Sequence, residues 1–269
     1  MTERRQAPGV GFIGLASTGW RIAAELSRIA NGLTVFDVDQ GLSMRFAERH
    51  GCPAAKDLDA LCEMQTLLFA PQDGETLRDI ERMIPSLRSG SIVVDMGASD
   101  PERTCAMGFR LARSGVAMMD APLCGVDRDE SAAPLAMGAD DEPARNIVLP
   151  LLNATGRQVL HAGRLGSGQV LRILEQHVRT ATLHARSEAL AAGERIGLSP
   201  ENLFAVLGPG ADVYGSLAQQ ASHGFAAGFT AGLFGNTASE STSLTAAPPG
   251  LTRVLIEFAT PPPKRKSLQ

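Results

Sequence analysis

The stretch GVGFIGLASTGW, residues 9–20, decides how the rest of the chain can be interpreted. A short apolar run, Val10 to Leu15, passes into small residues and then into a helical pattern. Dinucleotide-binding turns have this form, and their G-x-G-x-x-G frame lets the backbone approach a pyrophosphate at a helix N-terminus. Here the frame is Gly14, Ala16 and Gly19, so alanine replaces the second glycine. We expect its methyl group to crowd the pyrophosphate and to weaken nucleotide binding without abolishing it.

The composition indicates a broad class. The chain has 269 residues, of which 44% are hydrophobic and 20% charged, as is typical of soluble globular proteins. Its net charge is −4 and its basic residues are scattered, so we expect neither nucleic acid nor a membrane surface as a partner. The start MTERRQAPG has no apolar secretory core, and no run of 18 apolar residues follows. The four cysteines lack metal-ligand spacing, which predicts free thiols in a reducing cytoplasm and no metal site.

Strand-like and helix-like segments alternate up to about residue 160. The expected strands are 10–15, 33–38, 66–71, 91–96, 116–122, 133–139 and 157–163. A helix is predicted from Ser17 or Thr18 to Gly32, another after an Asp100 cap, and a third over 142–152. Apolar strands that alternate with helices predict an α/β fold, a doubly wound, mainly parallel sheet of the Rossmann type over residues 1–163.

The pattern changes after residue 163. Residues 167–196 contain no proline and two glycines, Gly168 and Gly193, with apolar residues at helical spacing, which predicts one helix of about eight turns. We therefore expect a smaller all-helical domain over residues 164–235. Residues 236–269 include NTASESTSLTAAPPG and the basic tail TPPPKRKSLQ, a composition typical of irregular or disordered segments.

Asp37 adds to the case for a nucleotide. It ends the second expected strand, 18 residues after Gly19, where an acid can bind the two hydroxyls of a ribose. Its charge would repel a 2′-phosphate, and no arginine follows it directly. The sequence therefore favours NAD over NADP.

Five segments together resemble the β-hydroxyacid dehydrogenases, the family of 3-hydroxyisobutyrate dehydrogenase and tartronate semialdehyde reductase. They are GFIGLASTG, FAP, DMGASDP, DAPLCGV and HAGRLGSGQVLRILEQ, in the family's order over roughly residues 10–235. The resemblance implies hydride transfer between a nicotinamide and the carbinol carbon of a small 3-hydroxy acid. The cofactor-binding residues that follow from it and from the turn are Gly14, Ala16, Ser17, Thr18, Gly19, Asp37, Pro71 and Ala98.

The last of these segments departs from the family at its catalytic lysine, which corresponds to Arg172. Arginine keeps its proton near neutrality and cannot be a base, but it can donate to a carbonyl or hold a carboxylate. The family's two asparagines correspond to Glu175 and Gln176. Residues 172 and 175 share a helix face, so an ion pair that occupies the guanidinium is the alternative to a ligand role.

The substrate motif departs as well. Cys124 stands where the family has serine, Gly125 keeps a glycine and Val126 replaces the next one. Cys124 is expected to be either a buried thiol or a substrate contact. The catalytic residues implied are Arg172, Cys124, Gly125 and Gln176.

These observations predict an NAD(P)-dependent oxidoreductase that acts on a small 3-hydroxy acid or a related carbonyl compound. The alternative is a catalytically impaired nucleotide- or metabolite-binding protein on the same scaffold. The family's C-terminal helices are only partly present, and a homodimer is an open expectation.

Overall fold

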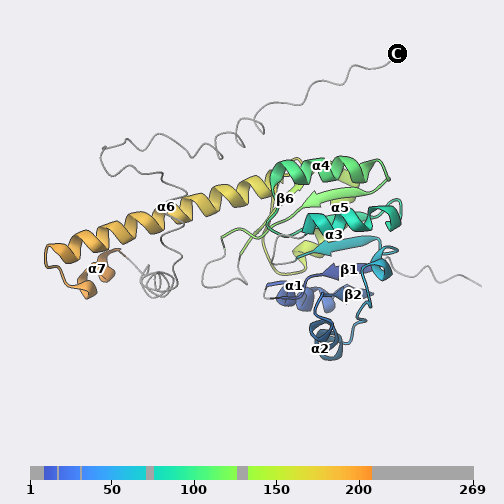
Figure 1. The fold of residues 1–269 in the computed structure, drawn as a ribbon, viewed down its shortest axis with the longest axis horizontal. Helices are drawn as coiled ribbons and strands as arrows, with labels where there is room; N and C mark the ends of the chain where they lie inside the picture. Colours follow the sequence, from blue (N-terminus) through green and yellow to red (C-terminus); the bar gives the residue numbers. More distant parts are fainter. Residues whose placement is uncertain (1–8, 17, 31, 71–75, 126–132, 208–269) are drawn as a thin grey trace, which may run out of the picture. The chain divides into compact units, whose positions relative to one another are not determined.

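The computed structural model describes residues 9–16, 18–30, 32–70, 76–125 and 133–207. The chain divides into two units, Met1–Glu175 and Gln176–Gln269. A seven-stranded sheet in the order β2-β1-β3-β4-β5-β6-β7 organises the first unit (Figure 1).

The strands confirm the predicted sheet. Its members are β1 (Val10–Ile13), β2 (Leu33–Phe36), β3 (Thr66–Phe69), β4 (Ile92–Asp95), β5 (Ala117–Asp120), β6 (Leu135–Ala139) and β7 (Val159–Gly163). Strands β1 to β5 are parallel, β6 is antiparallel to β5, and β7 is parallel to β6. The chain places β2 on one side of β1 and β3 on the other, and such a switch point is where open α/β sheets bind ligands, at the carboxyl ends of the strands.

The helices are α1 (Thr18–Ser27), α2 (Gln40–His50), α3 (Thr76–Met83), α4 (Pro101–Ala112), α5 (Glu142–Asn153), α6 (Ser167–Arg195) and α7 (Pro200–Leu207), with 3-10 turns η1 (Asp59–Leu61) and η2 (Ile84–Ser86). Asp100 caps α4 as predicted, because its side chain accepts the Arg103 N–H. Helix α1 is shorter than predicted and ends before Gly32. Helix α2 was not predicted, although Asp39 caps its start and Gly51 ends it in a left-handed conformation.

Apolar side chains alternate along the strands and cover the sheet on both faces. One core cluster joins the sheet to α1, α2 and α5, and includes Phe12, Leu68, Val94, Met119, Ile22, Phe46 and Val148. The other joins it to α3 and α4, and includes Ile13, Leu67, Phe69, Val93, Met118, Ile80 and Leu111. The sheet is therefore the middle of three layers, as the doubly wound prediction requires.

The second unit contains the rest of α6 and helix α7. The predicted single helix over 167–196 is confirmed by α6. Leu190 is buried, and a Cβ at Gly193 would lie 2.6 Å from a Leu203 methyl, so small and apolar residues pair these helices. The domain boundary at residue 164 stays a prediction, and the predicted tail over 236–269 lies outside the described residues.

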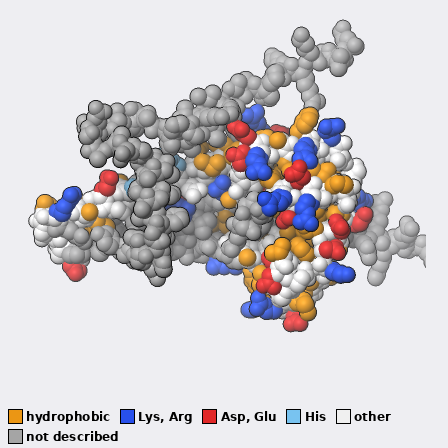
Figure 2. Space-filling model, viewed as in Figure 1, with side chains coloured by type: hydrophobic (Ala, Val, Ile, Leu, Met, Phe, Trp, Pro, Cys, Tyr) orange, Lys and Arg blue, Asp and Glu red, His pale blue; other side chains and the backbone are white. Residues whose placement is uncertain are grey.

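Two surface properties bear on partners. Basic and acidic side chains are interspersed on the face of the first unit shown in Figure 2. Within the part of the chain that the structure describes, no helix is long and apolar enough to cross a membrane.

Gly19 is the position where the turn after β1 depends most strictly on glycine. A Cβ there would overlap the carbonyl oxygen of Gly14, a backbone atom that cannot move aside. Replacement with alanine normally favours a helix, yet Gly19→Ala should lower the free energy of unfolding by about 1–3 kcal/mol. Urea unfolding measures this change.

Gly108→Ala is the matched control, because its Cβ would overlap the flexible end of Leu165 and would otherwise make an ordinary contact with the Met118 Cβ, at 3.7 Å. We expect it to cost less than Gly19→Ala. A Gly19→Ala protein as stable as the parent would contradict this packing of α1 on β1.

Candidate functional site

The predicted cofactor-binding residues that the structure describes lie at one edge of the sheet. Gly14 and Ala16 follow β1, Asp37 follows β2, and Ala98 follows β4. Because these strands are parallel, their carboxyl ends meet at the same edge. Ala16 is half-buried and Ala98 is exposed, so the edge is accessible there. Ser17 and Pro71 lie outside the described residues.

Two backbone hydrogen bonds shape the described part of the turn. Gly14 has a φ of 94°, and its N–H donates to Phe36 O at 2.9 Å. The Gly19 N–H donates to Ala16 O at 3.0 Å, which closes the turn as α1 begins at Thr18. The first N–H groups of α1 have no partners further back in the helix, so this N-terminus fits a pyrophosphate.

Asp37 holds the turn in addition to its predicted role. Its Oδ2 accepts the Leu15 N–H at 2.6 Å, and its Oδ1 accepts the Asp39 N–H at 2.9 Å. The side chain is buried, with 7% of the residue exposed. A carboxylate can accept about four hydrogen bonds, so these two leave capacity for a ribose hydroxyl.

A second part of the site forms around Asp120, at the end of β5. Its Oδ1 accepts the Gly166 N–H at 2.6 Å and its Oδ2 accepts the Gln169 N–H at 2.8 Å. The carboxylate therefore caps the N-terminus of α6. A Cβ at Gly168 would lie 2.7 Å from its Oδ2, and one at Gly138 would overlap its Oδ1, so both positions require glycine.

Burial is the main cause that raises the pKa of Asp120, to about 7. The two N–H groups oppose this shift, and the neighbouring carboxyl of Asp95 adds to it. Asp95 and Asp120 are register partners on β4 and β5. Burial also raises the pKa of Asp95, to about 6, against the nearby Ser99 side chain and the hydrogen bond from the Gly97 N–H.

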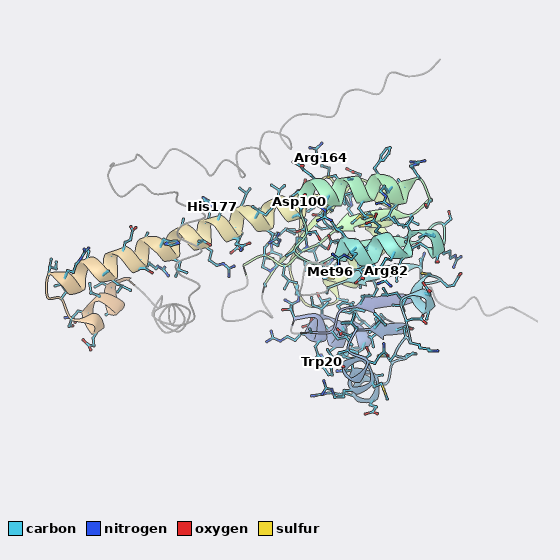
Figure 3. The ribbon with its side chains drawn as sticks, viewed as in Figure 1. Trp20, Arg82, Met96, Asp100, Arg164 and His177 are labelled. Carbon is cyan, nitrogen blue, oxygen red and sulfur yellow. The ribbon has the colours of Figure 1, made fainter. Side chains whose placement is uncertain are left out.

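Gln169 connects the loop after β4 to α6. Its Oε1 accepts the Ser99 N–H at 3.2 Å, and its Nε2 donates to Gly97 O at 2.8 Å. The same Oε1 accepts the Arg172 Nε–H at 3.1 Å. Figure 3 labels Met96 and Asp100, the two residues that flank this loop.

Arg172 is a half-buried cation close to this loop. Burial lowers the pKa of its guanidinium, and the neighbouring Cys124, Asp95 and Glu175 oppose that shift. Arginine remains protonated near neutrality even so, and can donate hydrogen bonds to a ligand. Glu175 lies near enough to influence Arg172, so the ion pair and the ligand role both stay predictions. Gln176 is exposed and belongs to the second unit.

Cys124 is buried, and its backbone N–H donates to Pro134 O at 2.9 Å. Burial raises the pKa of its thiol to about 11, Glu175 adds to the rise, and Arg172 opposes it. The thiol is therefore protonated near neutrality, which favours a packing role over nucleophilic chemistry. Gly125 follows with a φ of 66°, and Val126 lies outside the described residues.

Sequence reasoning missed Asp95, Asp120 and Gln169 as members of the site. Asp95 and Asp120 are the charged residues of the predicted apolar strands 91–96 and 116–122, which was the available signal. Gln169 gave no signal of its own, because its partners lie 70 and 72 residues away in the sequence.

A family model described as the NAD binding domain of 6-phosphogluconate dehydrogenase matches residues 9–163, and the chain belongs to this family. The 2-(hydroxymethyl)glutarate dehydrogenase of Eubacterium barkeri is 26% identical over 206 residues, 74% of this chain and 68% of that protein. The NAD-dependent L-serine dehydrogenase of Pseudomonas aeruginosa is 29% identical over 206 residues, with the same two shares.

Among solved structures, 3-hydroxyisobutyrate dehydrogenase of Mycobacterium tuberculosis has the same fold. Its TM-score is 0.67 at 18% identity, over 95% of this chain and 89% of that chain. These findings confirm the predicted fold and the resemblance to β-hydroxyacid dehydrogenases. They support binding of NAD(P), and they leave the preference for NAD as a prediction.

The raised pKa of Asp95 predicts a pH dependence of stability. The folded chain keeps the Asp95 proton up to a pH of about 6, whereas the ordinary pKa is 3.8. The protein should therefore lose stability as the pH rises from about 4 to about 6, by up to about 3 kcal/mol. Asp95→Asn removes the ionisable group and keeps an oxygen for the Gly97 N–H, so it should remove the Asp95 contribution to this loss and leave that of Asp120.

Urea unfolding of the parent and the variant at about pH 4.5 and about pH 7.5 tests the difference. Asp100→Asn, at the exposed cap of α4, is the matched control. If the difference between Asp95→Asn and the parent is the same at both pH values, the burial of an ionisable Asp95 is wrong.

Proposed function

We propose that the chain is an NAD-dependent dehydrogenase that oxidises the primary alcohol of a small 3-hydroxy acid to an aldehyde. The observation that carries the proposal is the half-buried Arg172, hydrogen-bonded through Gln169 to the loop of Ala98 at the edge that bears the dinucleotide turn. The compounds in the names of the relatives share a hydroxymethyl group on the carbon next to a carboxylate, including the L-serine named with the Mycobacterium structure.

The chemistry divides between the cofactor and the protein. When bound, NAD would supply the hydride acceptor for the carbinol carbon, and the hydroxyl proton would leave to solvent. Arg172 would bind an oxygen of the substrate, either the carboxylate or the oxygen that becomes the carbonyl. Because arginine cannot accept the hydroxyl proton, we expect slow oxidation in the unmodified protein.

The non-catalytic alternative has less support, since the relatives named above are dehydrogenases. A homodimer and a cytoplasmic location remain proposals. For the location, the support is that Cys52, Cys62, Cys105 and Cys124 are all free thiols.

Arg172 variants test the proposed reaction. Arg172→Met should raise KM for 3-hydroxyisobutyrate or L-serine about 10- to 100-fold, as expected for the loss of a charge-assisted hydrogen bond. Arg172→Lys should raise kcat, by up to about 10²-fold, because lysine can exchange a proton. Steady-state assays with NAD measure both constants.

Arg113→Met, which removes an exposed arginine after α4, is the matched control and should change neither constant. Turnover that is the same in the parent and in both Arg172 variants would contradict the substrate role. If the parent turns over at an ordinary dehydrogenase rate and Arg172→Lys lowers kcat, the protein does not lack a catalytic base.

Asp37 should make the protein bind NADH more tightly than NADPH. Asp37→Asn should narrow this gap, because it removes the charge that repels a 2′-phosphate. It should also weaken NADH binding, since the amide keeps one acceptor oxygen for the two N–H groups of Leu15 and Asp39.

Fluorescence titration with both reduced cofactors measures the ratio. Asp39→Asn is the control, because asparagine caps a helix as well as aspartate does. Equal affinity of the unmodified protein for NADH and NADPH refutes the preference.

A further inference from the structure

The side chain of Gln169 is fully buried and makes three hydrogen bonds. Two of them go to the backbone of the loop after β4, at Gly97 O and Ser99 N. In the third, the Gln169 Oε1 accepts the Nε–H of Arg172. One amide therefore contacts both the loop that carries Ala98 and the cation assigned to the substrate.

The partners allow only one orientation of this amide. The oxygen faces two N–H donors, and the NH₂ group faces a carbonyl oxygen. A flipped amide would place NH₂ against both donors and oxygen against oxygen. A shift of the loop would thus move the oxygen that holds Arg172.

The side chain is not needed to anchor α6. The start of that helix is held by Asp120 through the backbone N–H groups of Gly166 and Gln169, and these bonds do not depend on the side chain at 169. A buried amide is costly unless it is bonded, and an apolar residue could fill the space. The amide is therefore better explained by what it joins than by packing.

We propose that Gln169 is a positioning residue that couples the cofactor-side loop, Gly97 to Ser99, to the guanidinium of Arg172. This inference rests on the proposed function for the assignment of Arg172 to substrate. Its consequence is that a change at Arg172 is transmitted to cofactor binding through Gln169.

A double-mutant cycle on NADH affinity tests the coupling without a substrate. The four proteins are the parent, Gln169→Leu, Arg172→Met and the double variant. We expect Arg172→Met to weaken NADH binding in the parent and to have little effect once Gln169 is leucine. The dissociation constant of the double variant should therefore differ by about threefold or more from the value expected if the two single effects multiplied. Dissociation constants that multiply independently overturn the proposal.

Gln169→Glu provides a second readout in a single protein. A protonated glutamate reproduces the glutamine pattern, since one oxygen accepts and the hydroxyl donates to Gly97 O. An ionised glutamate places a second acceptor against that carbonyl. NADH affinity of Gln169→Glu should therefore recover as the pH falls, whereas Gln169→Leu should show no recovery relative to the parent.

This readout is available if Gln169→Leu does not fold, because it needs only the NADH affinities of Gln169→Glu and of the parent at each pH. An NADH affinity that follows the parent at every pH overturns the proposal. Turnover on 3-hydroxy acids reports separately on the proposed function: a coupled cycle without turnover refutes the substrate assignment only, and turnover with an uncoupled cycle refutes the role of Gln169 only.

Discussion

The buried carboxylate of Asp120 is the constraint on which the candidate site depends. A charge at the end of β5 is costly to bury, and the N–H groups of Gly166 and Gln169 offset part of that cost at the positive end of α6. Gly138 and Gly168 leave room for the carboxylate. Because the two hydrogen bonds of Asp120 fix where α6 begins, they also fix the positions of Gln169 and Arg172.

Most of the fold could be predicted because its signals are local. The apolar run before Gly14, the alternation of strands and helices, and the cap at Asp100 each depend on a few adjacent residues. Helix α2 was missed although Asp39 and Gly51 mark its ends, because its exposed face leaves a weak apolar pattern. Strand ends were predicted too long, since apolar residues such as Leu15 and Met96 continue into buried loops.

The site was predictable where a motif carries it and not where the fold assembles it. The turn residues, Asp37 and Arg172 follow from spacing and resemblance. The bonds of Asp120 to Gly166 and of Gln169 to Ser99 join residues 46 and 70 positions apart, and no local pattern encodes them. The second role of Asp37, which is to hold the Leu15 N–H, likewise depends on how β1 and β2 pair.

The carboxyl-end edge of the sheet thus carries two features: the turn after β1 that Asp37 holds, and Arg172 on α6, which Gln169 connects to the loop after β4. The central claim is that a nicotinamide and a 3-hydroxy acid meet between them. A crystal structure with NADH and 3-hydroxyisobutyrate tests it most directly. The account predicts the nicotinamide beside Ala98 and a substrate oxygen within hydrogen-bond distance of the Arg172 guanidinium. A hydroxy acid bound away from Arg172, with the cofactor in place, would contradict it.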